Sequence, residues 1–419
     1  MKKLLLAALA ALSLIAPAPA QTTLEEALKS PTRLEVLQLR DLKTPLGAEL
    51  AQFANLKVLI LSDLGLKSIP PEIGQLKDLQ VLILDGNQLT ALPSEVGRLA
   101  KLRMLTANNN QLASLPPLDN LARLELLAVS NNKLTSLPAL SSLRHLRASH
   151  NQLTAVPALA GLEDLDVSGN RLAAFPTEVL KSASLRSLVL AGNAIGSVPA
   201  EIGGLKMLDT LDLGNCQLKT LPAEVGQLSN LEKLYLQGNG LTGLPASLAD
   251  LLHLEQLDLS DNNLTRDAAV VFQITSLKGL DISGNNLGTI PEGLGELTQL
   301  VYLDLSDNQL TAVTATLGKL RALRTLLLAR NLLTEVPAPK KLTELRTLNL
   351  DGNKLTSMPD LKTLRDLSVL SLEGNSLSHV PPGLAGLSSL SQVTLRGNPI
   401  PAAEVSALKA AIPQANVEY

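Results

Sequence analysis

The stretch LQVLILDGNQLTALPSEVGRLAK, from Leu79 to Lys101, decides the fold, because variants of these 23 residues recur from Leu34 almost to the C-terminus. A period of this length is typical of solenoids, in which each repeat is too small to bury its own apolar face and must stack on its neighbours. The sequence therefore predicts one elongated repeat domain. Its function then becomes a question about surfaces.

Each repeat is expected to contribute one short strand and one short crossover. Alternating apolar residues around Leu82 and Leu84 predict the strand. Similar strands, one per repeat, stack in parallel and need a crossover each time. Leu92-Pro93 predicts extended backbone, and residues 94–99 predict about one helical turn. The repeats begin at seventeen leucines: Leu34, Leu56, Leu79, Leu102, Leu124, Leu143, Leu162, Leu185, Leu208, Leu231, Leu254, Leu277, Leu300, Leu323, Leu345, Leu367 and Leu390.

An asparagine at the ninth position of the repeat is the second signature. A buried amide at a sharp turn has donors and an acceptor for backbone groups that the end of a strand leaves unpaired. We therefore expect a stacked hydrogen-bond ladder, in which Cys216 is a structural substitute rather than a reactive thiol. The asparagines are Asn87, Asn110, Asn132, Asn151, Asn170, Asn193, Asn239, Asn262, Asn285, Asn308, Asn331, Asn353, Asn375 and Asn398.

The pattern LxxLxLxxNxLxxLPxxxxxLxx resembles the leucine-rich-repeat family over roughly residues 34–400, in its 23-residue form. The ending LPxEIGxL is seen from Ile69 to Leu76. The resemblance implies an α/β right-handed solenoid, a horseshoe with a parallel sheet on its concave face and short helical or extended crossovers on its convex face. It also implies partner binding on the concave sheet. The repeats from Leu124 and Leu143 are 19 residues long and resemble a shorter bacterial form, while residues 266–272 lack Leu-Pro and predict a more helical crossover.

The two ends of the chain carry different signals. Residues 1–20 have two lysines, an apolar run and a small-residue ending, which predict a signal peptide cleaved after Ala20 and a secreted or periplasmic protein. Residues 21–33 predict an N-terminal helical cap with a capping box of Thr23 and Glu26. The repeats fill residues 34–400, and residues 401–419 predict a C-terminal cap that is helical over 404–412. The signal and the caps together resemble those of a bacterial secreted member of the family.

Composition excludes several classes of function. Loss of Lys2 and Lys3 with the signal would take the net charge from −3 to −5, which gives no support for binding nucleic acid. No later stretch is apolar enough to insert into a membrane. A single cysteine cannot form an intrachain disulfide. No catalytic set, phosphate-binding loop or metal-binding spacing is present, so neither an enzyme nor a cofactor is predicted.

Columns of exposed side chains between the core leucines define the predicted surface. The second column alternates in charge through Arg103, Glu125 and Arg144, which is typical of structural charge ladders, and Arg147 beside Asp166 fits the same interpretation. The columns are apolar near the N-terminus, where they form a candidate patch. That patch comprises Val36, Val58, Ile60, Val81, Ile83 and Met104.

Later in the chain the columns become acidic and include two tyrosines. Like charges on adjacent strands repel, and aromatic residues are enriched at interfaces, so these residues form a candidate binding surface. The alternative is a merely solvated row of carboxylates. Calcium held by three of the aspartates and a metal held by His145 and His150 near Asp164 and Asp166 have weaker support, because the loop and ligand spacings of such sites are missing. The candidate binding residues are Asp212, Tyr235, Asp258, Asp281, Tyr302 and Asp304.

The sequence as a whole predicts a non-catalytic scaffold that recognises a protein, or an envelope ligand, on its concave face. A monomer without cofactor or metal is expected. The alternative is a structural envelope protein that self-associates through the apolar columns or through the segment near Phe272.

Overall fold

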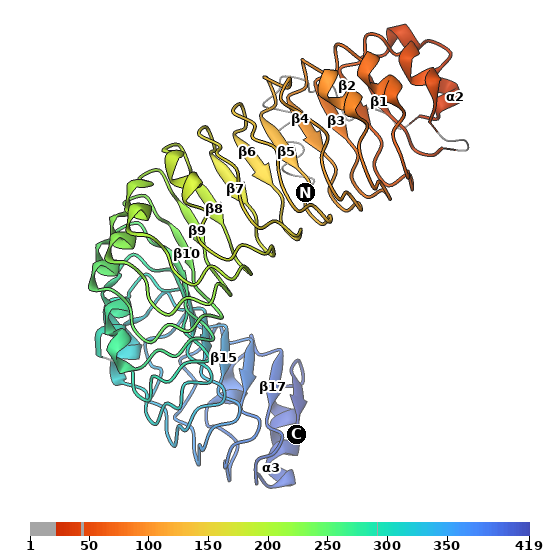
Figure 1. The fold of residues 1–419 in the computed structure, drawn as a ribbon. Coiled ribbons are helices and arrows are strands. Elements are labelled where there is room, and N and C mark those ends of the chain that lie inside the picture. The colour runs from red at the N-terminus through yellow and green to blue at the C-terminus, as the bar shows by residue number, and fades with distance from the viewer. Residues whose placement is uncertain (1–21, 43–45, 291) are drawn as a thin grey trace. The chain divides into compact units, whose positions relative to one another are not determined.

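The fold is that of a computed structural model, which describes residues 22–42, 46–290 and 292–419. The predicted signal peptide therefore lies outside the described residues. The chain divides into two compact units: residues 1–172 with 176–182, and residues 173–175 with 183–419. Each unit is described by itself below (Figure 1).

Each of the seventeen predicted repeats contributes one three-residue strand, which begins two residues after its first leucine. In the first unit the strands are β1 (Val36–Gln38), β2 (Val58–Ile60), β3 (Val81–Ile83), β4 (Met104–Thr106), β5 (Leu126–Ala128), β6 (His145–Arg147) and β7 (Asp164–Asp166). In the second unit they are β8 (Ser187–Val189), β9 (Thr210–Asp212), β10 (Lys233–Tyr235), β11 (Gln256–Asp258), β12 (Gly279–Asp281), β13 (Tyr302–Asp304), β14 (Thr325–Leu327), β15 (Thr347–Asn349), β16 (Val369–Ser371) and β17 (Gln392–Thr394). An eighteenth strand, β18 (Asn416–Glu418), was not predicted.

The strands of each unit follow one another in chain order and pair in parallel. In the first unit this holds from β1 to β7, and in the second from β8 to β18. The register aligns equivalent positions, so that Leu257 of β11 lies opposite Leu280 of β12. The predicted parallel α/β architecture is confirmed.

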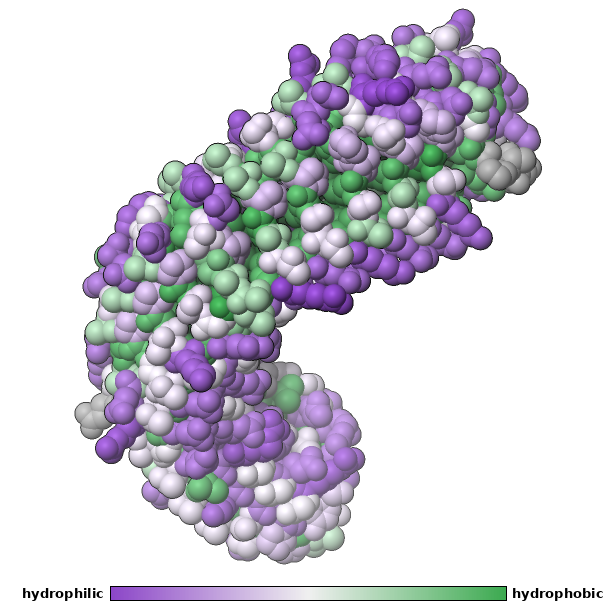
Figure 2. Space-filling view, viewed as in Figure 1, coloured by the Kyte–Doolittle hydropathy of each residue, from purple (hydrophilic) through white to green (hydrophobic). Residues whose placement is uncertain are grey.

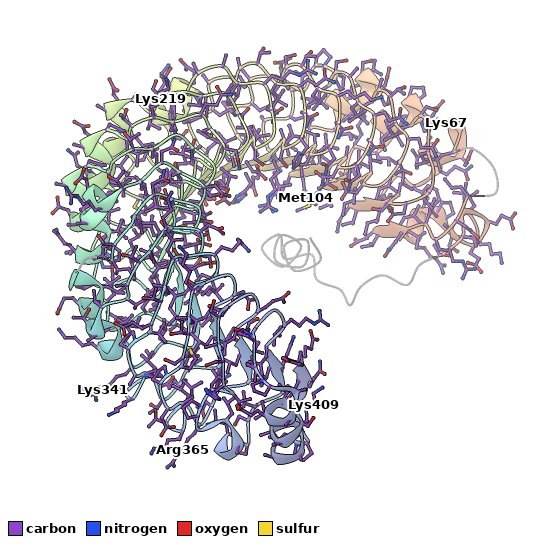
Figure 3. The ribbon with its side chains drawn as sticks, turned by 90° about the horizontal axis from the view of Figure 1, so that it is seen from below. Lys67, Met104, Lys219, Lys341, Arg365 and Lys409 are labelled. Atoms are coloured by element: carbon purple, nitrogen blue, oxygen red, sulfur yellow. The ribbon has the colours of Figure 1, made fainter. Side chains whose placement is uncertain are left out.

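Short helices occupy most crossovers, and α2 (Leu24–Ala27), the 3₁₀ helix η1 (Pro31–Arg33) and α3 (Ala402–Ala411) lie before the first and after the last of the seventeen repeat strands. The crossover helices are the 3₁₀ helices η2 (Ala48–Gln52), η3 (Pro71–Gln75), η4 (Ser94–Arg98), η5 (Thr177–Lys181), η6 (Ala200–Gly204), η7 (Ala223–Gln227), η8 (Ala246–Asp250), η9 (Arg266–Gln273), η10 (Glu292–Glu296), η11 (Ala315–Lys319) and η12 (Leu384–Gly386). Within residues 183–419 they lie on the outer side of the bend and the strands on its inner side (Figures 1 and 3). No helix forms in the extended crossovers between β4 and β7, where the short repeats were noted.

The core is a stack of leucines between strands and crossovers. The central residue of each strand points inward, as in Leu82, Leu105 and Leu280, all of which are fully buried. The longer helix η9 buries Val271 and Phe272, which confirms the predicted helical departure at residues 266–272.

The predicted asparagine ladder is present. The Nδ2 of Asn285 donates to the carbonyls of Leu259, Ile282 and Ser283 at 2.9–3.1 Å, and its Oδ1 accepts the Leu264 N–H at 2.9 Å. Each such amide therefore links the turn of its own repeat to the turn of the preceding one. Cys216 occupies the same slot, and burial raises the pKa of its thiol to about 11, which favours the unreactive protonated form.

The ends of the described chain are closed by helices. The Thr23 hydroxyl accepts the Glu26 N–H at 3.2 Å, and the Glu26 carboxylate accepts the Thr23 N–H at 3.0 Å, which confirms the capping box. At the other end Glu404 of α3 accepts the Val380 N–H at 3.0 Å and lies 2.8 Å from Nδ1 of His379. These hydrogen bonds hold the pKa of Glu404 below its usual range. Across the described ranges, no helix is long and apolar enough to cross a membrane.

Candidate binding surface on the strand face

The first and third residues of each strand point away from the leucine core, because side chains alternate along a strand. We call the surface that they form the strand face. In β9, β10, β12 and β13 these residues are half-buried while the central leucine is buried. The side chains that could meet a partner here are thus carried by rigid strands and fixed in register.

An acidic row runs along the strand face of the second unit. The third residues of β9 to β13 lie opposite one another in the register, so the row contains Asp212, Tyr235, Asp258, Asp281 and Asp304 in that order. Neighbouring strands are about 4.8 Å apart, which places three carboxylates side by side within about 10 Å. We call Asp258, Asp281 and Asp304 the acidic stripe.

Local hydrogen bonds hold one oxygen of each stripe carboxylate. Oδ1 of Asp281 accepts the backbone N–H of Ser283 at 3.0 Å and its hydroxyl at 2.6 Å, and Asp258 makes the same two bonds to Ser260. Oδ1 of Asp304 accepts the Ser306 N–H at 2.8 Å. The aspartates therefore stabilise the turn that follows each strand, a structural role that sequence reasoning missed. The recurring Asp-x-Ser sequence was the available signal.

Burial and mutual repulsion act on the same groups. Partial burial raises the pKa of Asp281 above its ordinary value, and the neighbouring charges of Asp304 and Asp258 add to the shift, against the bonds from Ser283. Burial beside these carboxylates also raises the pKa of the Tyr302 hydroxyl, which donates to Oδ2 of Asp304 at 3.4 Å. Negative charge is therefore concentrated along this row, although burial and repulsion both disfavour the ionised form of the carboxyl groups.

Some acids elsewhere on the protein pair with a cation on an adjacent repeat. Examples are Lys57 with Glu35 at 2.8 Å and Lys278 with Glu255 at 2.5 Å. By contrast, none of the three stripe carboxylates forms a salt bridge with any described residue. Other acids, such as Glu201, Glu224 and Asp250, likewise form no salt bridge with a described residue, so the stripe is set apart by the juxtaposition of its three carboxylates on adjacent strands.

The two tyrosines flank the stripe in different ways. Tyr235 belongs to the acidic row, next to Asp258, and its hydroxyl donates to Oε1 of Gln256 at 3.0 Å. Tyr302 lies in the neighbouring row, opposite Gly279 of β12. Gly279 places no side chain beside Tyr302, and a methyl group built at Gly279 would lie 4.0 Å from Cγ of Gln256. The six residues predicted as a binding surface therefore lie on five consecutive strands.

The fold also brings the predicted apolar patch of the first unit together in one cluster. Val58, Ile60, Val81, Ile83 and Met104 form one cluster, against which Val36 and Leu126 pack. The first five are at most 8% exposed, so their side chains are largely closed off rather than open. Figure 2 shows apolar residues as a band between polar margins on one side of the first unit.

Histidines and charge ladders behave as structural elements. His145 lies 2.6 Å from Oδ2 of Asp164, whereas His150 lies in a left-handed turn with φ of 53°. No group of three or more histidine, cysteine or acidic side chains in the described ranges is arranged to hold a metal ion. In the second column, Arg103 binds Glu125 and Arg144 binds Glu163, as the alternation of charge predicts.

Comparison with known proteins places the repeat in a family. The description "leucine-rich repeat region" matches residues 11–165 and 162–287, and "leucine rich repeat" matches residues 275–333 and 343–400. No curated protein matches the sequence significantly. Among solved structures, a leucine-rich-repeat protein of Leptospira interrogans is 32% identical, with a TM-score of 0.85 over 95% of this chain and 98% of that one.

Two further structures share the fold. A plant peptide hormone receptor, RGFR1, in complex with RGF2 is 27% identical, with a TM-score of 0.71 over 94% of this chain and 71% of that one. InlJ of Listeria monocytogenes is 22% identical, with a TM-score of 0.71 over 83% of this chain and 74% of that one, a likeness of fold alone. The family is typically a scaffold for protein interaction and is generally not enzymatic. This chain belongs to the leucine-rich-repeat family.

Proposed function

We propose that this protein is a non-catalytic, secreted or periplasmic scaffold that recognises a protein partner through the strand face of its second unit. The partner surface would be cationic, with side chains that pair with the acidic stripe and pack against Tyr235 and Tyr302. The predicted signal peptide, residues 1–20, supports the location outside the cytoplasm.

The observation that carries this proposal is the unpaired charge of the stripe. Three half-buried carboxylates on adjacent strands repel one another, and no described cation forms a salt bridge with them. Arg330, which pairs with Asp307, attracts Asp304 without forming a salt bridge to it. Their bonds to Ser260, Ser283 and Ser306 explain how each aspartate is tolerated, but those bonds use mainly one carboxylate oxygen. A cationic partner would lower the repulsion and gain charge-assisted hydrogen bonds on the other oxygen.

One observation counts against self-association, the alternative function. The large apolar side chains of η9, Val270, Val271 and Phe272, are at most 9% exposed, so this segment offers no large apolar side chain to a second copy. A monomer that binds a different protein is accordingly our proposal. Light scattering on the purified chain tests it, since a concentration-dependent oligomer would favour self-association.

The stripe is tested by the triple change Asp258→Asn, Asp281→Asn and Asp304→Asn. We expect affinity for a partner captured from the source organism's envelope to fall at least about tenfold, because the paired charges are lost while the shape is kept. The melting temperature at neutral pH should not fall. Asparagine retains an oxygen for the serine bonds, and the change removes the repulsion and the burial cost of charge.

The pH dependence of stability follows from the sign of the Asp281 shift. A carboxyl whose pKa is raised by folding favours its protonated form in the native state, so the wild type gains stability from this group as the pH falls through the raised value. The stability advantage of the triple variant over the wild type should therefore shrink on acidification toward pH ~4, the ordinary value of an aspartate.

A matched control removes three charges on the crossovers of the same unit, by Glu201→Gln, Glu224→Gln and Asp250→Asn. These residues lie on η6, η7 and η8. Wild-type affinity of the stripe variant would move the binding site away from the stripe. Equal losses in both variants would show a general charge effect instead.

A further inference from the structure

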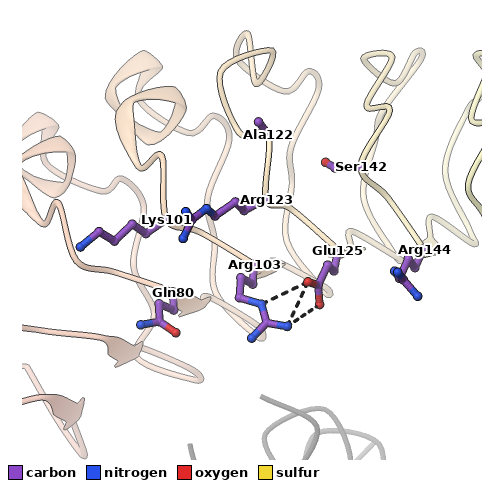
Figure 4. Close-up of a pocket in the computed structure, with 8 residues that line it drawn as sticks. All are labelled: Gln80, Lys101, Arg103, Ala122, Arg123, Glu125, Ser142 and Arg144. Atoms are coloured by element: carbon purple, nitrogen blue, oxygen red, sulfur yellow. Dashed lines mark hydrogen bonds and ion pairs between the residues drawn. The ribbon is translucent and has the colours of Figure 1, made fainter. Parts of the chain in front are cut away.

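A cationic pocket of about 460 Å³ lies in the first unit, beside the start of β4, β5 and β6. Two rows of side chains line it, one on each side of the buried leucine that opens each repeat (Figure 4). The first row is Lys101, Arg123 and Ser142, which directly precede those leucines. The second row is Gln80, Arg103, Glu125 and Arg144, which directly follow such a leucine.

The pocket coincides with a change in repeat length. The repeat from Leu79 has 23 residues and carries the helix η4, whereas the repeats from Leu124 and Leu143 have 19 residues and no helix. An extended crossover fills less space than a helical one, so the turns before these strands are less covered. In Figure 4, Lys101 and Arg123 extend in the same direction from neighbouring turns.

The carboxylates around the pocket are already committed to other cations. Oε1 and Oε2 of Glu125 accept from the Arg103 guanidinium at 3.0 and 2.9 Å. Asp78 holds Lys101 at 2.5 Å, and Glu163 holds Arg144 at 2.8 Å. Arg123 is the next cation in the first row, and among the described residues it has neither an ion pair nor a side-chain hydrogen bond.

Arg123 thus brings five unmatched N–H donors to a hollow with three other cations and one acid. A guanidinium of this kind binds carboxylate or phosphoryl oxygens through two parallel hydrogen bonds. A volume of 460 Å³ lies within the range of ligand-binding pockets, about 300–1,000 Å³. Glu125 and Glu163 interrupt the run of cations along the second row, which disfavours a uniform polyanion such as nucleic acid.

We propose that this pocket binds one acidic group, a carboxylate or a phosphoryl group, on a side chain of a protein partner. Arg123 makes the principal contact, and Lys101 and Arg103 add positive charge from either side. The proposal rests on the proposed function in one respect, namely that the partner is a protein. Its site, in the first unit, is separate from the acidic stripe.

Three peptides with one variable residue test the pocket on the purified full chain at low salt. The probes are acetyl-Ala-Ala-Glu-Ala-Ala-amide and its analogues with phosphoserine or glutamine in place of glutamate, titrated by calorimetry or NMR. We expect the glutamate and phosphoserine peptides to bind more tightly than the glutamine peptide, and binding to weaken with added salt. The tighter of the two acidic peptides identifies the source of the acidic group.

Two variants should shift this binding in opposite directions. Arg123→Gln should lower the affinity for the acidic peptides on the order of tenfold, because a charged bidentate contact is lost. Glu125→Gln should raise the affinity for the acidic peptides several-fold, because the Arg103 guanidinium is then no longer paired with the Glu125 carboxylate. Matched controls with the same charge changes are Arg171→Gln and Glu72→Gln, which lie in the first unit but do not line the pocket.

The proposal is overturned if the glutamine peptide binds as tightly as the acidic ones, or if Arg123→Gln behaves like Arg171→Gln. Because Arg123 is exposed, the melting temperature of the Arg123→Gln variant should match that of the wild type. A match would exclude unfolding as the cause of weaker peptide binding. Failure here leaves the stripe test of the second unit unaffected, and failure of the stripe variant leaves this pocket standing, so the two outcomes are distinguishable.

Discussion

Replacing Asn285 with alanine is expected to destabilise the second unit by about 1–3 kcal/mol, the cost of leaving a buried polar group without a partner. Asn285 is 3% exposed, so water does not replace its amide. The carbonyls of Leu259 and Ile282 would each keep a second donor, from Asn262 and Asn308. The Leu264 N–H would lose the side-chain oxygen that accepts it at 2.9 Å, and it carries most of the expected cost.

The neighbouring residue provides a close control for this change. Asn286 has the same side chain one position later but is exposed, and its Oδ1 accepts a hydrogen bond from Nε2 of Gln309 at 2.9 Å. Asn286→Ala should therefore leave the midpoint of urea unfolding nearly unchanged. Equal midpoints for Asn285→Ala and the wild type would contradict the ladder as a source of stability.

Phe272→Ala is expected to have the largest effect on stability, about 3–5 kcal/mol, because it removes a large buried side chain and leaves a cavity. Phe272 is 2% exposed at the end of η9. It packs closely against the next crossover, since a methyl group added at Gly293 would lie 3.2 Å from the Phe272 Cβ. The layers that it joins have no other aromatic residue with which to fill the space.

Urea unfolding followed by circular dichroism measures this loss, and Phe272→Leu is the matched variant. Leucine retains most of the apolar volume, so its midpoint should lie much nearer the wild type. If alanine and leucine at this position were equally stable, Phe272 would not be a packing element. The segment near it would then return as a candidate surface for self-association.

Most of the fold follows from positions that repeat in the sequence. Leucines at fixed offsets place every strand from β1 to β17, and the ninth-position asparagines place the turns. These features depend on contacts between equivalent residues of neighbouring repeats, so one repeat predicts the next. β18 escaped prediction because residues 416–418 lie outside the repeat and pair with β17 only through tertiary structure.

The candidate surfaces could be predicted only in part. The column positions of Asp258, Asp281 and Asp304 follow from the repeat, but their lack of salt bridges depends on every side chain within reach. The pocket around Arg123 was missed for a related reason. Its first row lies outside the strand columns, and its hollow arises where helical crossovers give way to extended ones, which spacing along the chain does not reveal.

Carboxyl-group footprinting of the complex with the captured partner tests the central claim most directly. A carbodiimide labels accessible carboxylates, and mass spectrometry reports the labelling of each acid with and without the partner. We predict that binding protects Asp258, Asp281 and Asp304 while Glu201 and Asp250 on the crossovers are labelled as before. Unchanged labelling of the stripe, with protection confined to the crossovers, would contradict recognition through the strand face.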